Sequence, residues 1–361
     1  MRSKDQALTI YDVAQHAGVS IASVSRVLNG HTTPRPETRE RVLRAVAELG
    51  FVPDGAARAL SSRLKEVVAV VYRQMWLEGN TEPVFESETE NLAFVDVMNR
   101  GIEVAARKRG FDLLMSSVDV HDQLPVPRLH SLAGKSDGML LHDRVLTPAA
   151  IVRLAERLPV VTLAATPTRA SVNVVGDNAA GMRVLIRHLI ETHDVRTIAY
   201  LSGHADSPDS VMRARAVQEE AAERGASVLT GTVWQGEYSA ISGARVIRKV
   251  LDRGGRLPDA IACANDQSAL GAAYALRERG IRIPEDVLLT GFDDIPLARH
   301  LNPPLTTVRQ PVQLMGATAF DALYAMIDGR KPEQRQLTLP VELVLRSSCG
   351  CAPRSPAGAP L

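Results

Sequence analysis

Apolar side chains recur at helical spacing in two short runs near the start of this chain. The inward positions of these runs are Ile10, Val13, Ala14 and Ala17, then Val24, Val27 and Leu28. Thr9 can cap the first helix, and Ser20 can cap a second one over 21–29. Gly18 lies between them and can adopt the positive φ that ends a helix. This pattern predicts a helix-turn-helix, whose second helix can lie in a DNA major groove.

The same spacing predicts a third helix over 37–49. Pro36 suits its first position, where a missing N–H costs nothing, and Gly50 ends it. Residues 54–65 then form an alanine-rich segment that is too short to be a stable helix alone. We therefore expect a DNA-binding domain over 1–53 and a hinge helix over 54–65.

From residue 66 the pattern changes to short apolar runs that alternate with helical segments. The apolar runs are Val67–Tyr72, Leu113–Ser116, Gly138–Leu141, Val160–Leu163, Val172–Val175, Ile198–Leu201, Ala260–Ala264 and Val287–Gly291. The helical segments are roughly 94–109, 148–157, 179–192, 211–224, 239–252, 267–279 and 312–328. Continuous apolar strands joined by helices predict parallel sheets that are covered on both faces. The fold class is therefore α/β, with two doubly wound lobes behind a three-helix head.

This second unit is expected to span 66–350. Lobe 1 takes about 66–165 and 312–339, and lobe 2 takes about 166–308 and 340–350. The tail over 351–361 is rich in Pro, Ala and Gly and is expected to be disordered.

The charge is divided unevenly along the 361 residues, whose net charge is only +1. Residues 1–65 hold ten Lys or Arg against six Asp or Glu, whereas the remainder is slightly acidic. A basic head suits contact with phosphates.

Other functions lack their usual signals in this sequence. No G-x-G-x-x-G follows the first strand, and neither G-x-S-x-G nor H-E-x-x-H occurs, so an enzyme is not expected. No apolar stretch reaches membrane-span length, and no signal peptide precedes Thr9, so we expect a cytoplasmic protein with no membrane contact.

Polar residues follow several of the predicted strands. In open parallel sheets, ligands bind beyond the carboxyl ends of the strands, so these residues should meet in one cleft. They are His142 and Asp143, Arg213 and Arg215, Asn265 and Asp266, and Asp293 and Asp294. Carboxylates, a guanidinium and an amide beside an aromatic ring suit a small polyhydroxy ligand.

The sequence resembles the lactose-repressor (LacI/GalR) family of bacterial transcription regulators over almost its whole length. In the head the resemblance is carried by Tyr11-Asp-Val-Ala14, Ala17-Gly-Val-Ser20 and Val24-Ser-Arg-Val-Leu-Asn29. In the body it is carried by Asp177–Gly181, Ala264–Gly271, Leu289–Asp294 and Pro304–Gln310. It implies a periplasmic-binding-protein-like body with two lobes.

The resemblance assigns roles in DNA binding by position. Ile21, Ala22 and Arg26 occupy the part of the second helix that reads base edges, and an Arg fork matches guanine. The positions that contact phosphates are Thr9, Tyr11, Ser25, Asn29 and Thr38. Core packing is the alternative for Tyr11. Ala57 and Leu60 match hinge residues that enter the minor groove, and packing against the next domain is the alternative for Leu60.

The resemblance also assigns effector contacts. They are His142, Arg213, Tyr238, Asn265, Asp293 and Gln310. Helix capping is the alternative for Asn265, turn capping for Asp293, and a solvated turn for His142. Two departures leave the ligand's identity open. Ala164 replaces an Asp that several sugar-binding members have, so that contact is either missing or supplied elsewhere, for example by Thr166 or Thr168. The acidic stretch 73–91 is longer than usual.

Three cysteines complete the candidate chemistry. Cys263 lies inside a strand and is expected to be a small buried apolar residue. Cys349 and Cys351 could bind a metal or form a redox pair. With no second C-x-C or His cluster apparent, no metal or cofactor is expected.

Together these features predict a transcription regulator, by default a repressor released by a sugar. A homodimer would bind a pseudo-palindromic double-stranded operator, and a ligand between the lobes would change the spacing of the hinges. The alternative is a sugar-binding transport component with no role at DNA. The identity of the effector, its sign and the operator sequence stay open.

Overall fold

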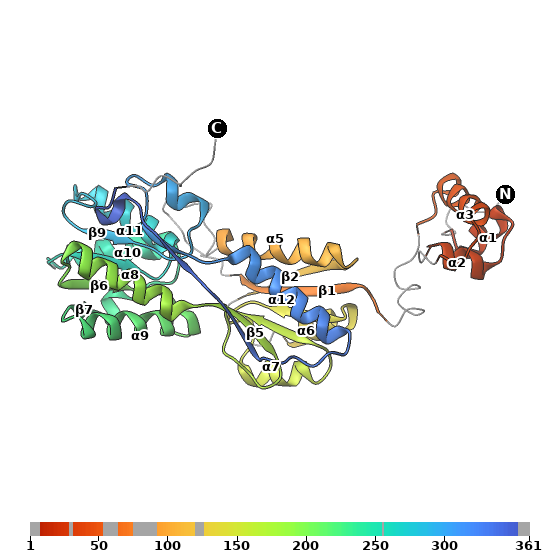
Figure 1. The fold of residues 1–361 in the computed structure, drawn as a ribbon, viewed down its shortest axis with the longest axis horizontal. Coiled ribbons are helices and arrows are strands. Elements are labelled where there is room, and N and C mark those ends of the chain that lie inside the picture. The colour runs from red at the N-terminus through yellow and green to blue at the C-terminus, as the bar shows by residue number, and fades with distance from the viewer. Residues whose placement is uncertain are drawn as a thin grey trace. The chain divides into compact units, whose positions relative to one another are not determined.

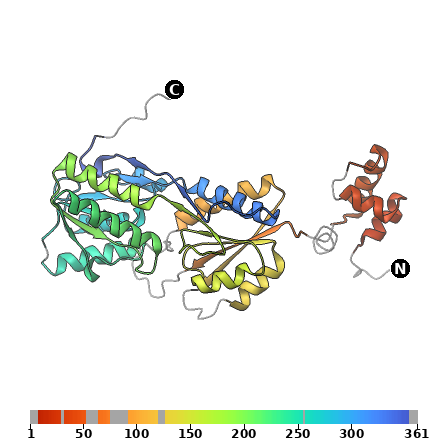
Figure 2. The ribbon, with the colours of Figure 1, turned by 60° about the horizontal axis from the view of Figure 1, so that its bottom comes forward.

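The chain divides into two units, Met1–Glu66 and Val67–Leu361, which we describe separately. The computed structural model describes residues 8–28, 32–52, 64–74, 92–119, 126–254 and 256–352. Most of the predicted hinge and tail, and most of the acidic stretch 73–91, therefore lie outside the described residues. Figure 1 labels the helices and strands, and Figure 2 shows the same ribbon from another side.

The first unit holds three helices, α1 (Ile10–Ala17), α2 (Ile21–Leu28) and α3 (Pro36–Leu49). Their inward residues form one small apolar core, made by Val13, Ala14, Ala17, Val24, Val27, Val42, Ala45 and Phe51. The predicted cap is present, because the Ser20 hydroxyl accepts a bond from the Ser23 N–H at 3.2 Å. The Arg41 side chain donates to the carbonyls of Ala17 and Gly18 at 2.5 and 2.8 Å, which fixes the turn between α1 and α2.

Lobe 1 contains a six-stranded parallel sheet in the order β11-β5-β4-β3-β1-β2. Its strands are β1 (Val67–Gln74), β2 (Asp112–Asp119), β3 (Gly138–Leu141), β4 (Val160–Leu163), β5 (Val172–Gly176) and β11 (Gln336–Leu339). Helices α5 (Leu92–Lys108) and α12 (Val312–Ile327) cover one face, and α6 (Val126–Lys135) and α7 (Pro148–Ala155) cover the other (Figure 2). Val68 and Val70 pack on the first face, Ala69 and Val71 on the second. The part of a strand that is buried on both sides must be apolar, as Val68–Val71 of β1 are.

Lobe 2 repeats this plan around a four-stranded parallel sheet in the order β7-β6-β8-β9. Its strands are β6 (Thr197–Leu201), β7 (Ser227–Leu229), β8 (Ala260–Cys263) and β9 (Leu288–Thr290). Its helices are α8 (Asn178–His193), α9 (Pro208–Glu223), α10 (Ala240–Asp252) and α11 (Asp266–Glu278). An antiparallel pair, β10 (Thr307–Arg309) and β12 (Glu342–Val344), lies beside this sheet, and the short helices η2 (Thr232–Trp234), η3 (Pro296–His300) and η4 (Ser347–Cys349) complete the lobe.

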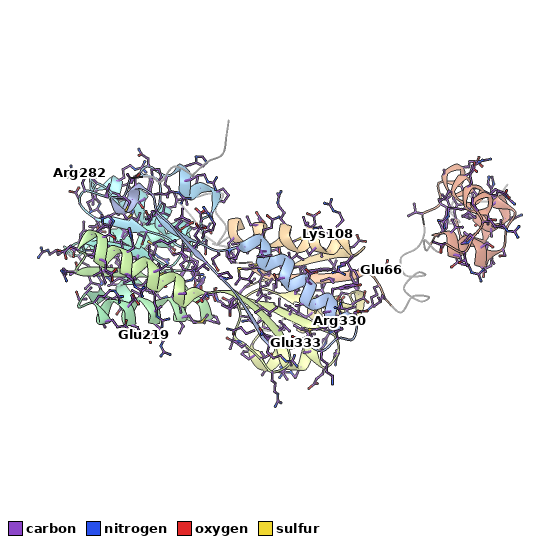
Figure 3. All side chains as sticks on the ribbon, viewed as in Figure 1. Glu66, Lys108, Glu219, Arg282, Arg330 and Glu333 are labelled. Carbon is purple, nitrogen blue, oxygen red and sulfur yellow. The ribbon has the colours of Figure 1, made fainter. Side chains whose placement is uncertain are left out.

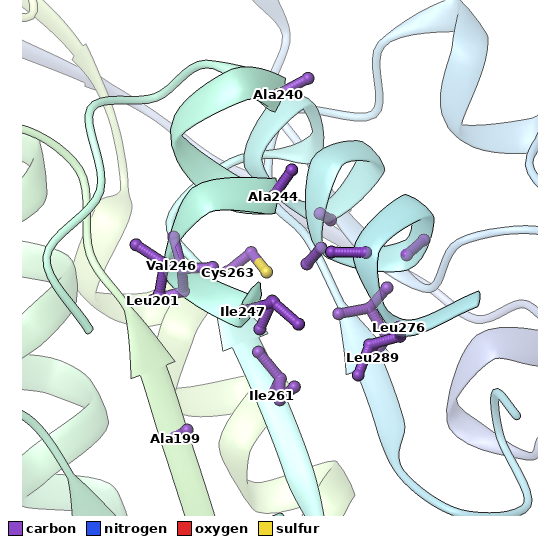
Figure 4. Packing of buried hydrophobic residues seen from close by; sticks show 14 of the residues in the cluster. Ala199, Leu201, Ala240, Ala244, Val246, Ile247, Ile261, Cys263, Leu276 and Leu289 are labelled. Atoms are coloured by element: carbon purple, nitrogen blue, oxygen red, sulfur yellow. The ribbon is translucent and has the colours of Figure 1, made fainter. Parts of the chain in front are cut away.

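Cys263 is fully buried in the core of lobe 2, as predicted. Figure 4 shows its sulfur among apolar side chains that include Leu201, Val246 and Ile247. Charged side chains that Figure 3 labels, such as Glu219 and Arg282, lie on the outside of the second unit.

The predicted boundary between the lobes at 166 is wrong. Strand β5 pairs with β4 and β11, so the chain stays in lobe 1 as far as Gly176. Further crossings follow Arg309 and Leu339, because β10 and β12 pair with each other whereas β11 pairs with β5. An apolar run in the sequence indicates a buried strand, but it does not show to which sheet that strand belongs.

Helix α6 was not predicted, and α9 begins earlier than expected, at Pro208. Pro127 and Pro208 lie in the first turns of these helices, where proline is favoured, but the apolar spacing did not point to these starts. Among the described helices, none combines the length and apolar character needed to cross a membrane.

Two glycines allow α5 and α12 to approach closely. A Cβ on Gly101 would lie 2.0 Å from the carbonyl oxygen of Gln313, and one on Gly316 would lie 2.1 Å from that of Met98. We expect Gly316→Ala to lower the free energy of unfolding by about 1–3 kcal/mol, because backbone cannot easily move aside. Urea unfolding of the full chain measures this.

Gly134, in α6, provides the matched control because a Cβ there meets nothing within 4 Å. Gly134→Ala should be neutral or stabilising by up to about 1 kcal/mol, since alanine favours a helix. Equal stability of the two variants would contradict the close approach.

Candidate functional site

The residues predicted to face DNA are at the surface of the first unit where the structure describes them. Ile21 is 41% exposed, and Ala22 and Arg26 are exposed on the same helix, α2. Tyr11 is 67% exposed, which excludes core packing. Thr9 is also exposed, and its hydroxyl and N–H both donate to the Asp12 carboxylate. Ser25 and Thr38 are half-buried, whereas Asn29, Ala57 and Leu60 lie outside the described residues.

The second unit contains a cleft of about 810 Å³ between its lobes, counting the part that is open to solvent. Lobe 1 contributes Tyr72, Arg73, Phe94, Met98, His142, Asp143 and Arg144. Lobe 2 contributes His204, Ser207, Asp209, Arg213, Tyr238 and Asp293. Most of these residues lie beyond the carboxyl ends of parallel strands or near the start of the helix that follows, where the sequence placed the site.

Arg213 is the buried centre of the lobe 2 side. Its Nε donates to Asn178 Oδ1 at 2.7 Å, and its Nη1 donates to the Ala264 carbonyl at 2.6 Å. The carboxylates of Asp209 and Asp293 lie 3.6 and 3.8 Å from its guanidinium nitrogens. Burial alone would lower the pKa of Arg213, but Asp293, Tyr238 and Asp209 raise it overall. The cation is therefore kept charged and fixed in place.

The guanidinium of Arg213 also lies flat over a ring. Its Cζ atom is 3.8 Å from the centroid of Phe292. Arg215, the other arginine noted in this segment, points away from the cleft and pairs with Glu219 on the exposed side of α9.

Asp293 lies in the cleft with its backbone in an unusual conformation. Its φ is 117°, and that of Asp294 is 56°. Gln310 Nε2 donates to Asp293 Oδ1 at 2.7 Å. Burial raises the pKa of Asp293 to about 6, against the opposing effects of Arg213 and Gln310. Gln310 does not line the cleft, so its role in the structure is to position Asp293.

Tyr238 and Asn265 have different roles, although both were expected to contact ligand. The Tyr238 ring lines the cleft and meets His204 edge to face at 5.7 Å. Asn265 is buried below it, where its Oδ1 accepts from the Ser268 N–H and its Nδ2 donates to the Tyr238 carbonyl. Asn265 therefore caps α11 and holds Tyr238, whose φ is 66°.

His142 and Asp143 follow β3 and face the cleft from lobe 1. His142 Nε2 lies 3.2 Å from Asn99 Oδ1, and burial lowers the pKa of His142 to about 4, so the ring is neutral. Burial raises the pKa of Asp143 to about 7, helped by the nearby Asp209 and opposed by a bond from Ser207. The two acids near this carboxyl group are Asp209 and Asp206, both from lobe 2.

The departure at Ala164 leaves an apolar wall. Ala164 lines the cleft, whereas neither Thr166 nor Thr168 does. The Thr168 hydroxyl instead lies 2.7 Å from that of Ser171. Of the two alternatives, the structure favours a missing contact over one from these threonines.

Several functional positions were missed from the sequence. Asp209 lies in the first turn of α9, where its Oδ1 accepts a hydrogen bond from Asn178 Nδ2 at 2.9 Å. This places a second carboxylate beside Arg213. Asp206 joins the lobes, with its carboxylate 3.0 Å from Arg144 Nε and 3.9 Å from Arg73 Nη1. The only local signal for these two residues was the capping pattern before α9. Such a pattern does not show which distant side chains the two carboxylates will contact.

Comparison with known proteins agrees with this architecture. Residues 9–54 match the model of bacterial regulatory proteins of the lacI family, and residues 186–349 match that of a periplasmic binding protein-like domain. The regulator CelR of Thermobifida fusca is 34% identical over 352 residues, which cover 94% of this chain and 98% of that protein. The HTH-type transcriptional repressor PurR of Aliivibrio fischeri is 30% identical over 348 residues, with the same coverage of 94% and 98%.

Solved structures show the same likeness. A Lac repressor dimer bound to operator and the anti-inducer ONPF superposes with a TM-score of 0.81 at 26% identity, covering 95% of this chain and 99% of that one. A complex of CelR with cellobiose gives a TM-score of 0.67 at 31% identity, covering 94% and 99%.

The head, the body and its cleft define a ligand-controlled, DNA-binding transcription regulator. The chain belongs to the lacI family of bacterial regulatory proteins. Its relatives are transcription regulators rather than enzymes.

The raised pKa of Asp143 predicts how stability depends on pH. Because the folded pKa of about 7 lies above the ordinary 3.8, protonation stabilises the fold at low pH, and this contribution is lost as the pH rises through about 7. Asp143→Asn removes the buried charge. Relative to wild type, it should gain on the order of 2 kcal/mol at pH 8 and much less at pH 5.

Denaturant unfolding at the two pH values measures this difference. Asp96→Asn, at an exposed position on α5, is the control and should not reproduce the pH dependence. A gain by Asp143→Asn that is the same at both pH values would rule out titration of this group.

Proposed function

We propose that this protein is a repressor whose operator affinity is lowered by a sugar bound in the cleft between its lobes. The observation that carries this proposal is the arrangement around Arg213. A fixed cation and the carboxylates of Asp143, Asp209 and Asp293 offer donors and acceptors for several hydroxyl groups. The rings of Tyr72, Phe94 and Tyr238 can cover the C–H faces of a sugar ring.

We propose a ligand of one or two sugar rings. Cellobiose bound to the related CelR is of this size class. The contacts that we assign to the ligand are those of His142, Arg213, Tyr238 and Asp293. Asn265 positions Tyr238 and Gln310 positions Asp293, and we assign neither of them a contact with the ligand.

The coupling between sugar and DNA rests on the relative position of the lobes. Asp206 already forms ion pairs across the cleft with Arg144 and Arg73, so a ligand among these residues changes the balance between lobe positions. We propose that the lobes of a homodimer set the separation of two hinges, as the dimer–operator structure of the Lac repressor suggests. Sugar and operator then affect each other's binding reciprocally.

The alternative, a sugar-binding transport component, would not need the three-helix DNA-binding unit at the start of this chain. The match of residues 9–54 to the DNA-binding part of the family favours the regulator. Action on operator DNA would place the protein in the cytoplasm.

Thermal-shift and DNA-binding measurements test the effector site together. Duplexes selected from a random pool by the full-length protein should share a pseudo-palindrome, and a panel of sugars that includes cellobiose should contain one that weakens binding. Asp293→Asn should abolish the thermal shift with that sugar and keep operator affinity, because the head is unchanged.

Leu314→Ala, on the exposed side of α12, is the control and should retain both responses. Loss of the sugar response in this control, or its retention in Asp293→Asn, would place the ligand elsewhere. A protein that selects no common sequence would contradict the regulator itself.

Arg26 tests the assignment of the base-reading helix. Arg26→Ala should weaken binding to the selected operator by about 1–3 kcal/mol and relax the preference at one base pair of each half-site. Fluorescence anisotropy with single-base variants of the duplex measures both effects. Arg44→Ala, an exposed arginine on α3 paired with Glu40, is the matched control and should leave the base preference intact.

A further inference from the structure

Two histidines and two cysteines meet at the end of lobe 2 that carries the last turn of α8. His188 and His193 come from that helix, and Cys349 and Cys351 come from the C-terminal segment. One candidate ligand atom from each residue can be chosen so that all four lie within 4.8 Å of one another. Our expectation that no His cluster accompanies the cysteines is therefore wrong. The histidines are remote in sequence, and only the fold brings them near.

Four of the six separations among the ligand atoms fit a tetrahedral metal site, and all six are within 4.8 Å. With Zn–S bonds of about 2.3 Å and Zn–N bonds of about 2.0 Å, ligand atoms should lie about 3.3 Å apart for two nitrogens and about 3.5 Å for nitrogen and sulfur. The two Nε2 atoms are 3.3 Å apart. His188 Nε2 lies 3.7 Å from Cys349 Sγ and 3.4 Å from Cys351 Sγ, and His193 Nε2 lies 3.4 Å from Cys351 Sγ.

The backbone explains why both cysteines face the same point. Residues i and i+2 of an extended chain already share one side. Here the short helix η4 ends at Cys349, and Gly350 follows with a φ of 86°, so the chain turns between the two cysteines. A residue with a Cβ is strained in that conformation, so Gly350 suits the turn. On the other side, α8 ends at His193, where Asp194 adopts a φ of 52°.

Neighbouring hydroxyl groups can orient two of these ligands. The Thr192 hydroxyl lies 3.2 Å from His188 Nδ1 and can accept a hydrogen bond from Nδ1–H when Nε2 binds the metal. The Thr306 hydroxyl lies 3.0 Å from Cys349 Sγ and can donate to a thiolate.

We propose that His188, His193, Cys349 and Cys351 form a structural Zn²⁺ site that fastens the C-terminal segment to α8. Two sulfur and two nitrogen ligands at tetrahedral spacing select zinc over magnesium or calcium, which prefer oxygen. Two thiolates balance the charge of the ion. Four protein ligands fill the coordination shell and leave no position for a substrate, so the site is structural rather than catalytic.

The segment that this metal would hold also supports the effector site. Arg346 donates to Asp294 Oδ1 at 2.6 Å and to the Leu305 carbonyl at 2.8 Å. Asp294 directly follows Asp293 in the cleft. The proposed metal therefore anchors a segment that braces the turn carrying Asp293, although the zinc proposal does not depend on the identity of the effector.

The metal content of the purified full-length chain tests the proposal. Protein from zinc-supplemented cells, purified under reducing conditions without chelator, should contain about one zinc per chain by elemental analysis. Replacement by Co²⁺ should give the absorption bands of tetrahedral cobalt together with thiolate-to-cobalt charge transfer. A strong chelator should lower the melting temperature, and added Zn²⁺ should restore it.

Variants separate this site from non-specific binding. Cys351→Ser and His193→Asn should each lower the zinc content several-fold and remove the chelator effect. Cys263→Ala and His130→Asn change a core cysteine and an exposed histidine outside the cluster, so both should keep one zinc. If a variant fails to fold, the cobalt spectrum of the wild-type chain still decides the chemistry.

Zinc well below one equivalent, with no cobalt–thiolate bands in the reduced wild-type chain, would overturn the proposal. A disulfide between Cys349 and Cys351 that persists after mild reduction, found by mass spectrometry, would also overturn it. Equal zinc content in the cluster variants and the controls would show that the metal binds elsewhere.

Discussion

Lobe 2 depends on the buried positive charge of the Arg213 guanidinium. Arg213 is enclosed between α8, α9, the end of β8 and the turn after β9, and a buried guanidinium must be paired. Asp209, Asp293, Asn178 and a backbone carbonyl meet this need. The same bonds place carboxylate oxygens at fixed positions along the cleft. Folding and ligand recognition therefore use one network, and a residue lost from it affects both.

The cleft also contains backbone conformations that L side chains rarely adopt. Tyr238, Asp293 and Ala164 have positive φ values, and all three line the cleft. Such conformations persist only where the surroundings fix them. Asn265 fixes the first through the Tyr238 carbonyl, and Gln310 fixes the second through the Asp293 carboxylate. Gly203 leaves room for the Tyr238 ring, which would lie 2.2 Å from a Cβ at that position. Residues that never touch the ligand thus determine the shape of its site.

Control of DNA binding by a ligand requires that the lobes respond as units. Each lobe has its own sheet with helices on both faces, so its interior is continuous and stiff. The connections between lobes follow Gly176, Arg309 and Leu339, and the direct contacts of Asp206 with Arg73 and Arg144 are ion pairs near the solvent. Ion pairs of this kind contribute little stability and exchange easily. A ligand can therefore shift the lobes without disturbing either core.

The sequence by itself determined the helix-turn-helix, the parallel strands and the chain positions that follow them, because spacing and capping act over a few residues. It placed Arg213, Asp293 and His142 at the cleft for the same reason, since a strand end is a local feature. Only the tertiary structure decided that β5 belongs to lobe 1, that Asn265 is a cap beneath Tyr238, and that Asp209 completes the charge network. It alone brought His188 and His193 to Cys349 and Cys351. These pairings join residues that are far apart in sequence, and they form only when packed helices and sheets bring distant segments together.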